Sequence, residues 1–237
     1  MFPVVVVPTY NEQPNLATLI AALLADEQLR VLVVDDGSPD GTGDEADRLA
    51  AGSGGRMSVL HRTGPRGLGR SYIDGFRAAL KSGATHVFQM DADLSHDPAD
   101  IPRLRMASET ADLVLGSRYV PGGELWNWPA HRRLLSAFAN AYVRLITRLP
   151  VRDCTSGFRC WRRELLMRIP LERIVSEGYA FQVELTWEAC RARGRVAEIP
   201  IRFVERRQGA SKMSGRVIVE SAVLPWRLIA RPRRHAE

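Results

Sequence analysis

Two carboxylates one residue apart, Asp91 and Asp93, directly follow a short apolar run of the sequence. Oxygen ligands with this spacing can hold a hard divalent cation, with a phosphate group of the substrate completing its coordination. Such a cation would stabilise negative charge on a departing diphosphate. Taken alone, the same pattern is also typical of an aspartate-rich turn, ahead of a helix that Asp97 would cap before Pro98.

Polar clusters follow two other apolar runs, at residues 8–12 (Pro-Thr-Tyr-Asn-Glu) and 35–42 (Asp-Asp-Gly-Ser-Pro-Asp-Gly-Thr). The adjacent carboxylates Asp35 and Asp36 can accept hydrogen bonds from the base N–H groups or ribose hydroxyls of a nucleoside, or can simply form a turn. The glycine-rich segment 64–69 lacks the Gly-Lys-Ser/Thr of a phosphate-binding P-loop. It predicts a helix start that places Arg66 or Arg70 near an anion.

The apolar runs and the segments between them predict the framework that positions these clusters. Short, β-branched runs at 4–7, 31–34, 58–61, 87–90 and 113–115 predict buried strands, and the segments 14–24, 42–51, 68–81 and 98–107 predict helices. Alternation of strands and helices predicts a mostly parallel sheet with helices on both faces. Since ligands bind beyond the carboxyl ends of such strands, the three polar clusters should meet on one rim.

The second half of the chain has a different pattern. A flexible segment opens at Pro121 and contains Trp126 and Trp128. Beyond it, the pattern predicts helices over 132–149 and 179–193, a strand over 197–204, a polar loop over 206–214 and a terminal helix over 217–230 that Pro225 interrupts.

Composition excludes several classes of protein. The 237 residues are 45% hydrophobic and 25% charged, which fits one large domain, or one domain with a short appendage, and excludes a disordered chain or a disulfide-stapled miniprotein; we expect a single domain over 1–237. No uncharged stretch approaches the roughly 20 residues of a membrane span, so no transmembrane domain is expected. The three cysteines form no Cys-x-x-Cys pair and indicate buried thiols in a reducing cytoplasm.

Charge is divided unevenly along the chain. Residues 1–117 carry 10 basic and 16 acidic side chains, whereas residues 118–237 carry 23 and 11, within a total of 33 and 27. This division predicts an acidic half that holds a cation and a basic half that meets an anion, such as a phosphorylated substrate, lipid headgroups or nucleic acid. No nucleic-acid-binding module is recognisable, so nucleic acid is not expected as a partner.

Taken together, the motifs resemble the family 2 glycosyltransferases, and more narrowly the dolichol- or polyprenol-phosphate mannosyltransferases. The resemblance covers nearly the whole chain in order, and its motifs are residues 8–12, 34–42, 67–69, 90–98, 116–119, 155–159, 177–182 and 209–212. One departure is Pro65, at a position where the family often has Lys, with Arg66 one place later.

The resemblance implies a GT-A fold: a Rossmann-like, mostly parallel sheet flanked by helices, with C-terminal amphipathic interface helices. It implies inverting transfer of mannose from GDP-mannose to a polyprenyl or dolichyl monophosphate, assisted by Mg²⁺ or Mn²⁺. The catalytic residues would be Asp93, Arg118 and Arg132, and the metal ligands Asp91, Asp93 and Ser95. The resemblance assigns the nucleotide sugar to Pro8, Thr9, Tyr10, Glu12, Asp35, Asp36, Asp91, Arg206 and Lys212, and the acceptor phosphate to Arg118, Arg132, Ser136 and Ser211.

The charge of a phosphate monoester supports this assignment independently of the resemblance. A phosphate monoester is mostly a dianion at neutral pH, so as a nucleophile it needs positioning and charge neutralisation rather than a general base. Arginine suits this task because its planar fork pairs bidentately with phosphate. Asp153 is expected to orient an arginine or the acceptor rather than to act as a base.

The same resemblance raises the question of a membrane. Apolar residues spaced three and four apart run from Leu135 to Leu149, and a helix with this pattern can face the core or lie in a membrane interface. Because the acceptor is an isoprenoid, we expect a peripheral protein on the cytoplasmic face of a membrane, with a separate membrane-anchoring protein as a candidate partner. The alternative function is the same transfer from UDP-glucose or another sugar nucleotide.

Overall fold

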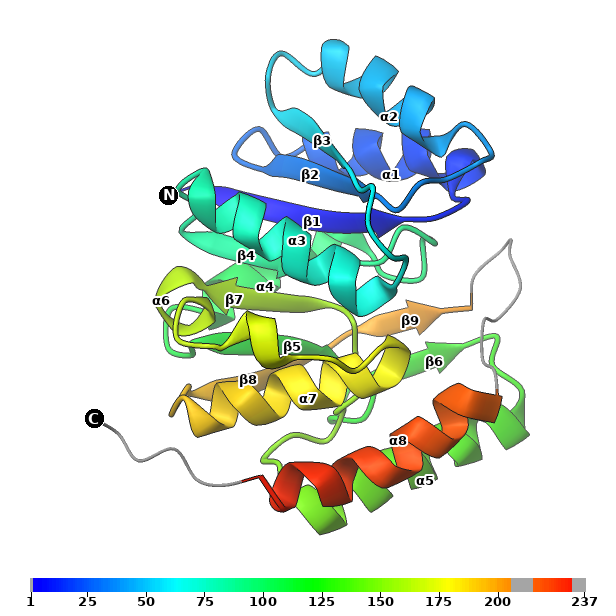
Figure 1. The fold of residues 1–237 in the computed structure, drawn as a ribbon, viewed down its shortest axis with the longest axis vertical. Coiled ribbons are helices and arrows are strands. Elements are labelled where there is room, and N and C mark those ends of the chain that lie inside the picture. The colour runs from blue at the N-terminus through cyan, green and yellow to red at the C-terminus, as the bar shows by residue number, and fades with distance from the viewer. Residues whose placement is uncertain (1, 206–214, 232–237) are drawn as a thin grey trace.

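A seven-stranded sheet forms the centre of the computed structural model, which describes residues 2–205 and 215–231, with side chains described up to residue 205 and from residue 222 (Figure 1). The sheet has the order β3-β2-β1-β4-β7-β5-β8. Its strands are β1 (Pro3–Thr9), β2 (Arg30–Asp35), β3 (Met57–His61), β4 (His86–Gln89), β5 (Leu113–Ser117), β7 (Arg159–Arg162) and β8 (Val196–Pro200). The neighbouring pairs β1–β2, β1–β4, β2–β3 and β5–β8 are parallel, so the expected mostly parallel sheet is confirmed.

The central strands are apolar on both faces, as a sheet between two helical layers requires. Along β1, Val4 and Val6 point into one core cluster, whereas Val5 and Val7 point into the other. All four are at most 4% exposed. This alternation explains why the sequence shows a continuous apolar run here rather than a polar-apolar alternation.

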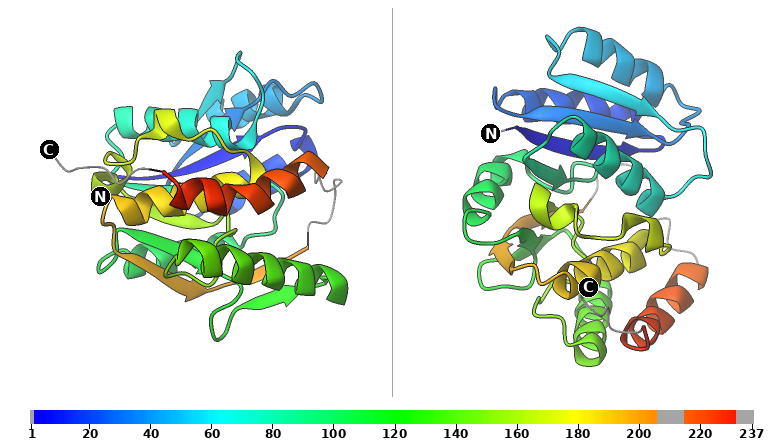
Figure 2. Two further views of the ribbon diagram at one scale, coloured as in Figure 1. Left: turned by 60° about the horizontal axis from the view of Figure 1, so that its bottom comes forward. Right: turned by 60° about the vertical axis from the view of Figure 1, so that its left-hand side comes forward.

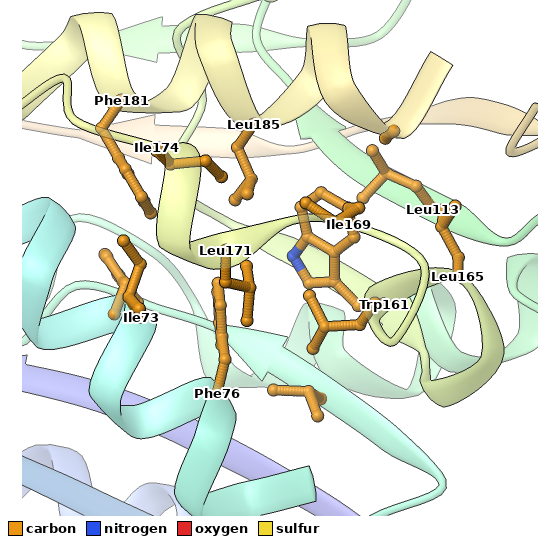
Figure 3. Close-up of a cluster of buried hydrophobic side chains, with 14 of the residues drawn as sticks. Ile73, Phe76, Leu113, Trp161, Leu165, Ile169, Leu171, Ile174, Phe181 and Leu185 are labelled. Carbon is orange, nitrogen blue, oxygen red and sulfur yellow. The ribbon is translucent and has the colours of Figure 1, made fainter. Parts of the chain in front are cut away.

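Helices cover the two faces. On one face lie α1 (Gln13–Leu24), α2 (Thr42–Ala51) and α4 (Ile101–Ala107), whose buried residues share a cluster with Val5 and Val7. On the other face, α3 (Leu68–Lys81) and α7 (Gly178–Arg191) pack aromatic and aliphatic side chains around Trp161 of β7 (Figure 3). The four helices predicted in the first half are confirmed, with the fourth divided into a short 3₁₀ turn (Pro98–Asp100) and α4.

Strand β7 is the largest difference from the sequence prediction. It runs antiparallel between β4 and β5, followed by the short helix α6 (Arg163–Leu166) and a 3₁₀ turn (Leu171–Arg173). Its sequence, Arg-Cys-Trp-Arg, has no apolar run that would predict a buried strand. Arg159 is nevertheless buried, because the tertiary structure supplies hydrogen-bond partners for its guanidinium. Strand β7 also inserts a segment of the second half between strands of the first, so the two halves share one sheet.

The predicted strand over 197–204 is in fact two strands. Strand β8 ends at Pro200, and β9 (Arg202–Val204) pairs instead with β6 (Glu124–Trp126) in a separate two-stranded sheet. The segment expected to be flexible therefore contains β6. The chain changes partner at Ile201, whose N–H donates to the Ser117 carbonyl of β5 and whose carbonyl accepts from the Glu124 N–H of β6.

Two long helices lie side by side at the end of the molecule opposite α2 (Figures 1 and 2). They are α5 (Ala130–Thr147) and α8 (Gly215–Ile229), so the prediction of α5 is offset by two residues. Helix α8 continues through Pro225, and the predicted interruption is wrong. The Tyr142 hydroxyl of α5 donates to the Ala222 carbonyl at 2.7 Å and accepts from Trp226 Nε1 at 2.9 Å, which holds α8 on both sides of the proline.

Candidate active site

A cavity of about 430 Å³ opens at the carboxyl ends of β1, β2 and β4. All three predicted polar clusters contribute to its wall, as the strand-end rule requires. The site residues that line it are Pro8, Thr9, Tyr10, Glu12, Asp36, Asp91 and Asp93. The remainder of the wall comes from Ala92, from the turn at residues 66–67 and the start of α3, from Thr155 and Gly157, and from Gly178, Tyr179 and Gln182 of α7.

Asp91 and Asp93, the predicted metal ligands, both line this cavity. The buried Tyr72 hydroxyl donates to Asp91 Oδ1 at 2.8 Å, and the Ser95 backbone N–H donates to Asp93 Oδ1 at 3.1 Å. A Cβ added to Gly157 would lie 2.9 Å from Asp91 Oδ2, so a larger residue there would push the carboxylate away. Burial, followed by the neighbouring Asp91, raises the pKa of Tyr72 well above 10, so its hydroxyl keeps the proton it donates.

These residues fit a hard divalent cation. Both carboxylates face the cavity, and the buried Ser95 Oγ beside them has no hydrogen-bond partner among the described residues. Within the described residues no three His, Cys, Asp or Glu side chains gather into a metal site. Two carboxylates would leave several coordination positions to the substrate, as is usual for Mg²⁺ and Mn²⁺. Ser95 itself does not line the cavity, and its role as a ligand stays a prediction.

Asp36 and Asp35 differ in where they point. Asp36 lines the cavity, accepts from the Gly67 N–H at 2.8 Å and pairs with the nearly buried Arg62. Asp35 does not line the cavity: its Oδ1 accepts from Ser38 Oγ at 2.5 Å and lies 3.4 Å from Thr9 Oγ1. Asp36 is therefore placed to meet a ligand, whereas Asp35 shapes the turn after β2.

Arg66 occupies the rim where the sequence departs from the family pattern. Its Nη1 donates to the Tyr10 hydroxyl at 2.5 Å, and its guanidinium lies 4.7 Å from the centre of the Tyr10 ring. The turn that follows is tightly packed, because a Cβ on Gly67 would lie 2.3 Å from Glu177 Oε1 and one on Gly69 would lie 2.7 Å from the Ser176 carbonyl. At Gly69, where the neighbouring atom belongs to the backbone, only glycine permits this approach of α3 to the segment before α7.

Arg118 and Asp153 form a buried ion pair beside the cavity. Arg118 Nε and Nη2 each donate to one oxygen of Asp153 at 2.7 Å, and Nη2 also donates to Thr155 Oγ1 at 2.7 Å. Burial alone would raise the pKa of Asp153, but the Arg118 charge and hydrogen bonds outweigh burial and lower it. Asp153 thus orients an arginine, one of the two roles expected of it. Through Thr155, the pair touches the wall of the cavity.

Arg132 lies further out on α5. Its guanidinium stacks 4.0 Å from the centre of the Trp128 ring and donates to Glu205, while Arg118 lies 5.8 Å from the same ring. Trp128 therefore brings together the two arginines assigned to the acceptor phosphate. Ser136 follows Arg132 by one helical turn and lines neither this cavity nor the next.

A second cavity of about 460 Å³ lies on the other side of Arg118, between β6 and α5. Its wall combines apolar side chains with two arginines: Arg118, Tyr119, Gly123, Glu124, Leu125, Trp126, Arg133, Leu134 and Ala137. The Arg118–Asp153 pair thus stands between an acid-lined cavity and a partly apolar one.

Helix α5 exposes its apolar stripe and buries a different face. Leu135, Phe138 and Leu145 are 57%, 70% and 81% exposed, whereas the buried residues are Asn140, Val143 and Thr147. Trp226 of the neighbouring α8 is 55% exposed. The core-facing alternative is therefore wrong for these three residues of the stripe, whereas Tyr142 is half-buried against the core cluster and Leu149, beyond the end of α5, is buried. No helix within residues 2–205 and 215–231 combines the length and hydrophobicity that crossing a bilayer requires.

Three predicted site residues, Arg206, Ser211 and Lys212, lie outside the described residues. The sequence also missed several groups that support the site: Arg62, Tyr72, Trp128 and Glu205. Tyr72 had a signal, since a helix beginning at the Gly-Leu-Gly turn places it one turn in, beside the strand ends. The pairing of Arg62 with Asp36 depends on the packing of β3 beside β2 and had no local signal.

The sequence matches the family model for "Glycosyl transferase family 2" over residues 4–169. Two curated relatives match most of the chain. It is 48% identical to the polyprenol monophosphomannose synthase of Mycolicibacterium smegmatis, over 92% of this chain and 83% of the relative. It is 47% identical to the undecaprenyl-phosphate mannosyltransferase of Micrococcus luteus, over 95% of this chain and 94% of the relative.

Solved structures share the fold at lower identity. The glucosyl-3-phosphoglycerate synthase of Mycobacterium tuberculosis superposes with a TM-score of 0.65 at 20% identity, over 96% of this chain and 77% of that one. A mannosyltransferase of Pyrobaculum calidifontis, in complex with GDP-mannose and Mn²⁺, has a TM-score of 0.58 at 18% identity, over 96% and 72%. These two similarities support the fold alone.

Proposed function

Because this chain belongs to glycosyl transferase family 2 and is a glycosyltransferase, we propose that it transfers mannose from GDP-mannose to a polyprenyl monophosphate, with inversion at the sugar carbon. The observation that carries the proposal is the position of Thr155. It lines the cavity that holds Asp91 and Asp93, and it accepts a hydrogen bond from Arg118, which is assigned to the acceptor phosphate. The diphosphate of the donor and the phosphate of the acceptor would thus lie close together, with Thr155 between their binding groups.

The donor would lie along the first cavity. Asp36 and Tyr10 are placed for its nucleoside, and Asp91 and Asp93, with Ser95 as the third predicted ligand, would hold Mg²⁺ or Mn²⁺ at its diphosphate. When bound, the cation would supply positive charge that favours departure of GDP. The name of each 47–48% identical relative supports the mannosyl and polyprenyl-phosphate parts of this proposal.

The acceptor phosphate would enter beside Arg118 and Arg132. As a dianion it attacks the sugar carbon directly, on the face opposite the leaving diphosphate, so no protein base is required. Asp153 contacts Arg118 at this point, and its buried bidentate contact and lowered pKa make it a poor proton acceptor. Its role is to hold the guanidinium in place.

A transfer assay tests this proposal. Labelled GDP-mannose with a short polyprenyl phosphate should give labelled lipid in the presence of Mg²⁺ or Mn²⁺, and the product should be lost after chelation. Asp93→Asn should reduce turnover about a thousandfold. The matched control is Asp97→Asn in the same loop, where Asp97 only caps Ala99, and it should leave turnover unchanged. Efficient transfer from UDP-glucose, with none from GDP-mannose, would contradict the mannose assignment.

We propose that the protein is peripheral on the cytoplasmic side of a membrane, and the exposed apolar residues of α5 and α8 support its contact with a membrane surface. Vesicles with anionic lipids should sediment the protein, and Phe138→Glu should weaken that binding about tenfold or more. Met106→Glu, at a 66% exposed residue of α4, is the control and should have no effect. Binding only in the presence of a separate anchoring protein would show that such a protein, rather than lipid, covers this face.

A further inference from the structure

A chain of three buried polar side chains runs from the core to the first cavity. Trp161 Nε1 on β7 donates to Gln89 Oε1 on β4 at 3.1 Å, and Gln89 Nε2 donates to Gln182 Oε1 on α7 at 2.8 Å. Trp161 lies in the apolar cluster of Figure 3, and the three residues are 0%, 0% and 3% exposed. Burying two amides costs free energy unless their hydrogen bonds are made, so the burial of Gln89 and Gln182 depends on this pairing with each other and with Trp161.

Trp161 fixes the orientation of both amides. An indole N–H can only donate, so Gln89 must present its oxygen to Trp161. The Gln89 NH₂ group then faces Gln182, which must present its own oxygen in return. The orientation of an amide is normally uncertain from geometry alone, but here the indole determines it. Gln182 is left with its NH₂ group directed away from Gln89.

Gln182 is part of the cavity wall. It follows Gly178 and Tyr179 by four and three residues on α7, and all three line the cavity. Its backbone carbonyl accepts from Arg159 Nη2 at 3.0 Å and from Thr186 Oγ1 at 2.9 Å, so its position is well determined. Within the described residues, no hydrogen-bond acceptor lies on its Nε2. A substrate oxygen in the cavity is the partner that this donor lacks.

We propose that Gln182 recognises the transferred hexose by donating a hydrogen bond from Nε2 to a sugar oxygen, and that Gln89 and Trp161 are positioning residues that fix this donor. The inference rests on the proposed function. Gln182 shares the wall with Gly157, which packs against Asp91, and with Thr155, which accepts a hydrogen bond from Arg118, so this part of the wall joins the Asp91–Asp93 pair to Arg118. The hexose must lie in that interval, because it is passed from the diphosphate to the acceptor phosphate.

Calorimetry with GDP-mannose and with GDP, both in the presence of Mn²⁺, tests the contact. Gln182→Met keeps the length of the side chain and removes the donor. It should weaken GDP-mannose binding about fivefold to tenfold and change GDP binding less than about twofold, since GDP has no hexose. Thr186→Val is the matched control: it perturbs the same turn of α7 without changing the donor, and it should leave the ratio of the two dissociation constants unchanged.

Gln89→Met tests the positioning role. It leaves Gln182 in place but frees its amide to rotate, so it should weaken GDP-mannose binding about threefold and leave GDP binding unchanged. If the hydrogen bonds among Trp161, Gln89 and Gln182 had a purely structural role, both variants would have a lower melting temperature, and their affinities for GDP-mannose and for GDP would fall by the same factor. That result would overturn the inference.

Two further outcomes separate this inference from the proposed function. If Gln182→Met leaves GDP-mannose binding intact but raises the KM for polyprenyl phosphate, the amide contacts the acceptor phosphate and the hexose assignment is wrong. If the unmodified protein turns over UDP-glucose rather than GDP-mannose, the proposed donor is wrong. The contact is then tested by the same variants with UDP-glucose and UDP, and an unchanged ratio would overturn it.

Discussion

Arg118 and Arg132 have the same predicted partner, the acceptor phosphate, but the protein holds them in opposite ways. Arg118 is 5% exposed, and its two-point contact is with a fully buried carboxylate. Arg132 is 27% exposed, stacks on Trp128 and contacts the partly exposed Glu205. This difference indicates that Arg118 is a structural part of the fold, whereas Arg132 can exchange Glu205 for a bound anion at a small cost in free energy.

Removing the inner arginine should have the largest effect. Arg118→Ala leaves Asp153 buried without a cationic partner, so the free energy of unfolding should fall by about 3–5 kcal/mol, measured by urea denaturation. The double variant Arg118→Met with Asp153→Leu should recover part of this loss. A single variant as stable as the parent would remove the distinction between the two arginines.

Removing the outer arginine should affect binding rather than folding. Arg132→Ala should raise the KM for polyprenyl phosphate about tenfold, or about 1.4 kcal/mol, with less than about 1 kcal/mol lost from stability. Steady-state kinetics and urea denaturation of the same preparation measure both. Arg133→Ala, at the neighbouring residue on the second cavity, is the control with a smaller expected effect. An equal loss in both variants would indicate a diffuse basic surface instead of a defined contact.

Tyr72, an uncharged residue that contacts the donor cavity through Asp91, can be compared with the two arginines of the acceptor side. Tyr72→Phe removes only the hydroxyl that donates to Asp91, and stability should fall by about 1 kcal/mol. Mn²⁺ binding, followed by electron paramagnetic resonance, should weaken severalfold because Asp91 loses its orientation. Phe76→Leu perturbs the same aromatic cluster and serves as the control, since it should cost stability without changing Mn²⁺ affinity.

The smallest effect is expected where the geometry of the Arg118 pair recurs on the surface. Arg195 also contacts both oxygens of a carboxylate, Asp112, but its side chain is 60% exposed. Arg195→Ala should change the melting temperature by less than about 2 °C at neutral pH. A change as large as that of Arg118→Ala would mean that two-point geometry, rather than burial, sets the strength of these pairs.

The same surface pair has a defined pH dependence. The hydrogen bond from Arg195 lowers the pKa of Asp112 from 3.8 to about 2. The pair's small contribution is therefore present above about pH 4 and lost as the pH falls through about 2. Thermal unfolding between pH 5 and pH 2 should show this loss in the parent and not in Arg195→Ala.

Local sequence was a good guide wherever a residue's role depended on its own strand or helix. The strands of the first half, and the polar clusters that follow three of them, were predicted because β-branched runs and glycine-bounded helices can be recognised from local sequence. The carboxylates at 91 and 93 reached the cavity because strand ends meet on one rim. Strand β7 was missed because Arg159 makes its sequence look exposed, and only partners from distant segments allow its burial.

By itself, then, the sequence determined the α/β architecture, the rim that gathers the carboxylates and the family to which the chain belongs. Only the tertiary structure decided how each charged group is held: Asp35 in a turn, Arg118 in a buried pair, Arg132 against a tryptophan, and the amide of Gln182 turned toward the cavity. The physical reason is that a strand or helix follows from neighbours along the chain. The partner of a buried polar group comes from wherever the fold brings one: Asp153 lies 35 residues from Arg118, and Gln89 lies 93 residues from Gln182.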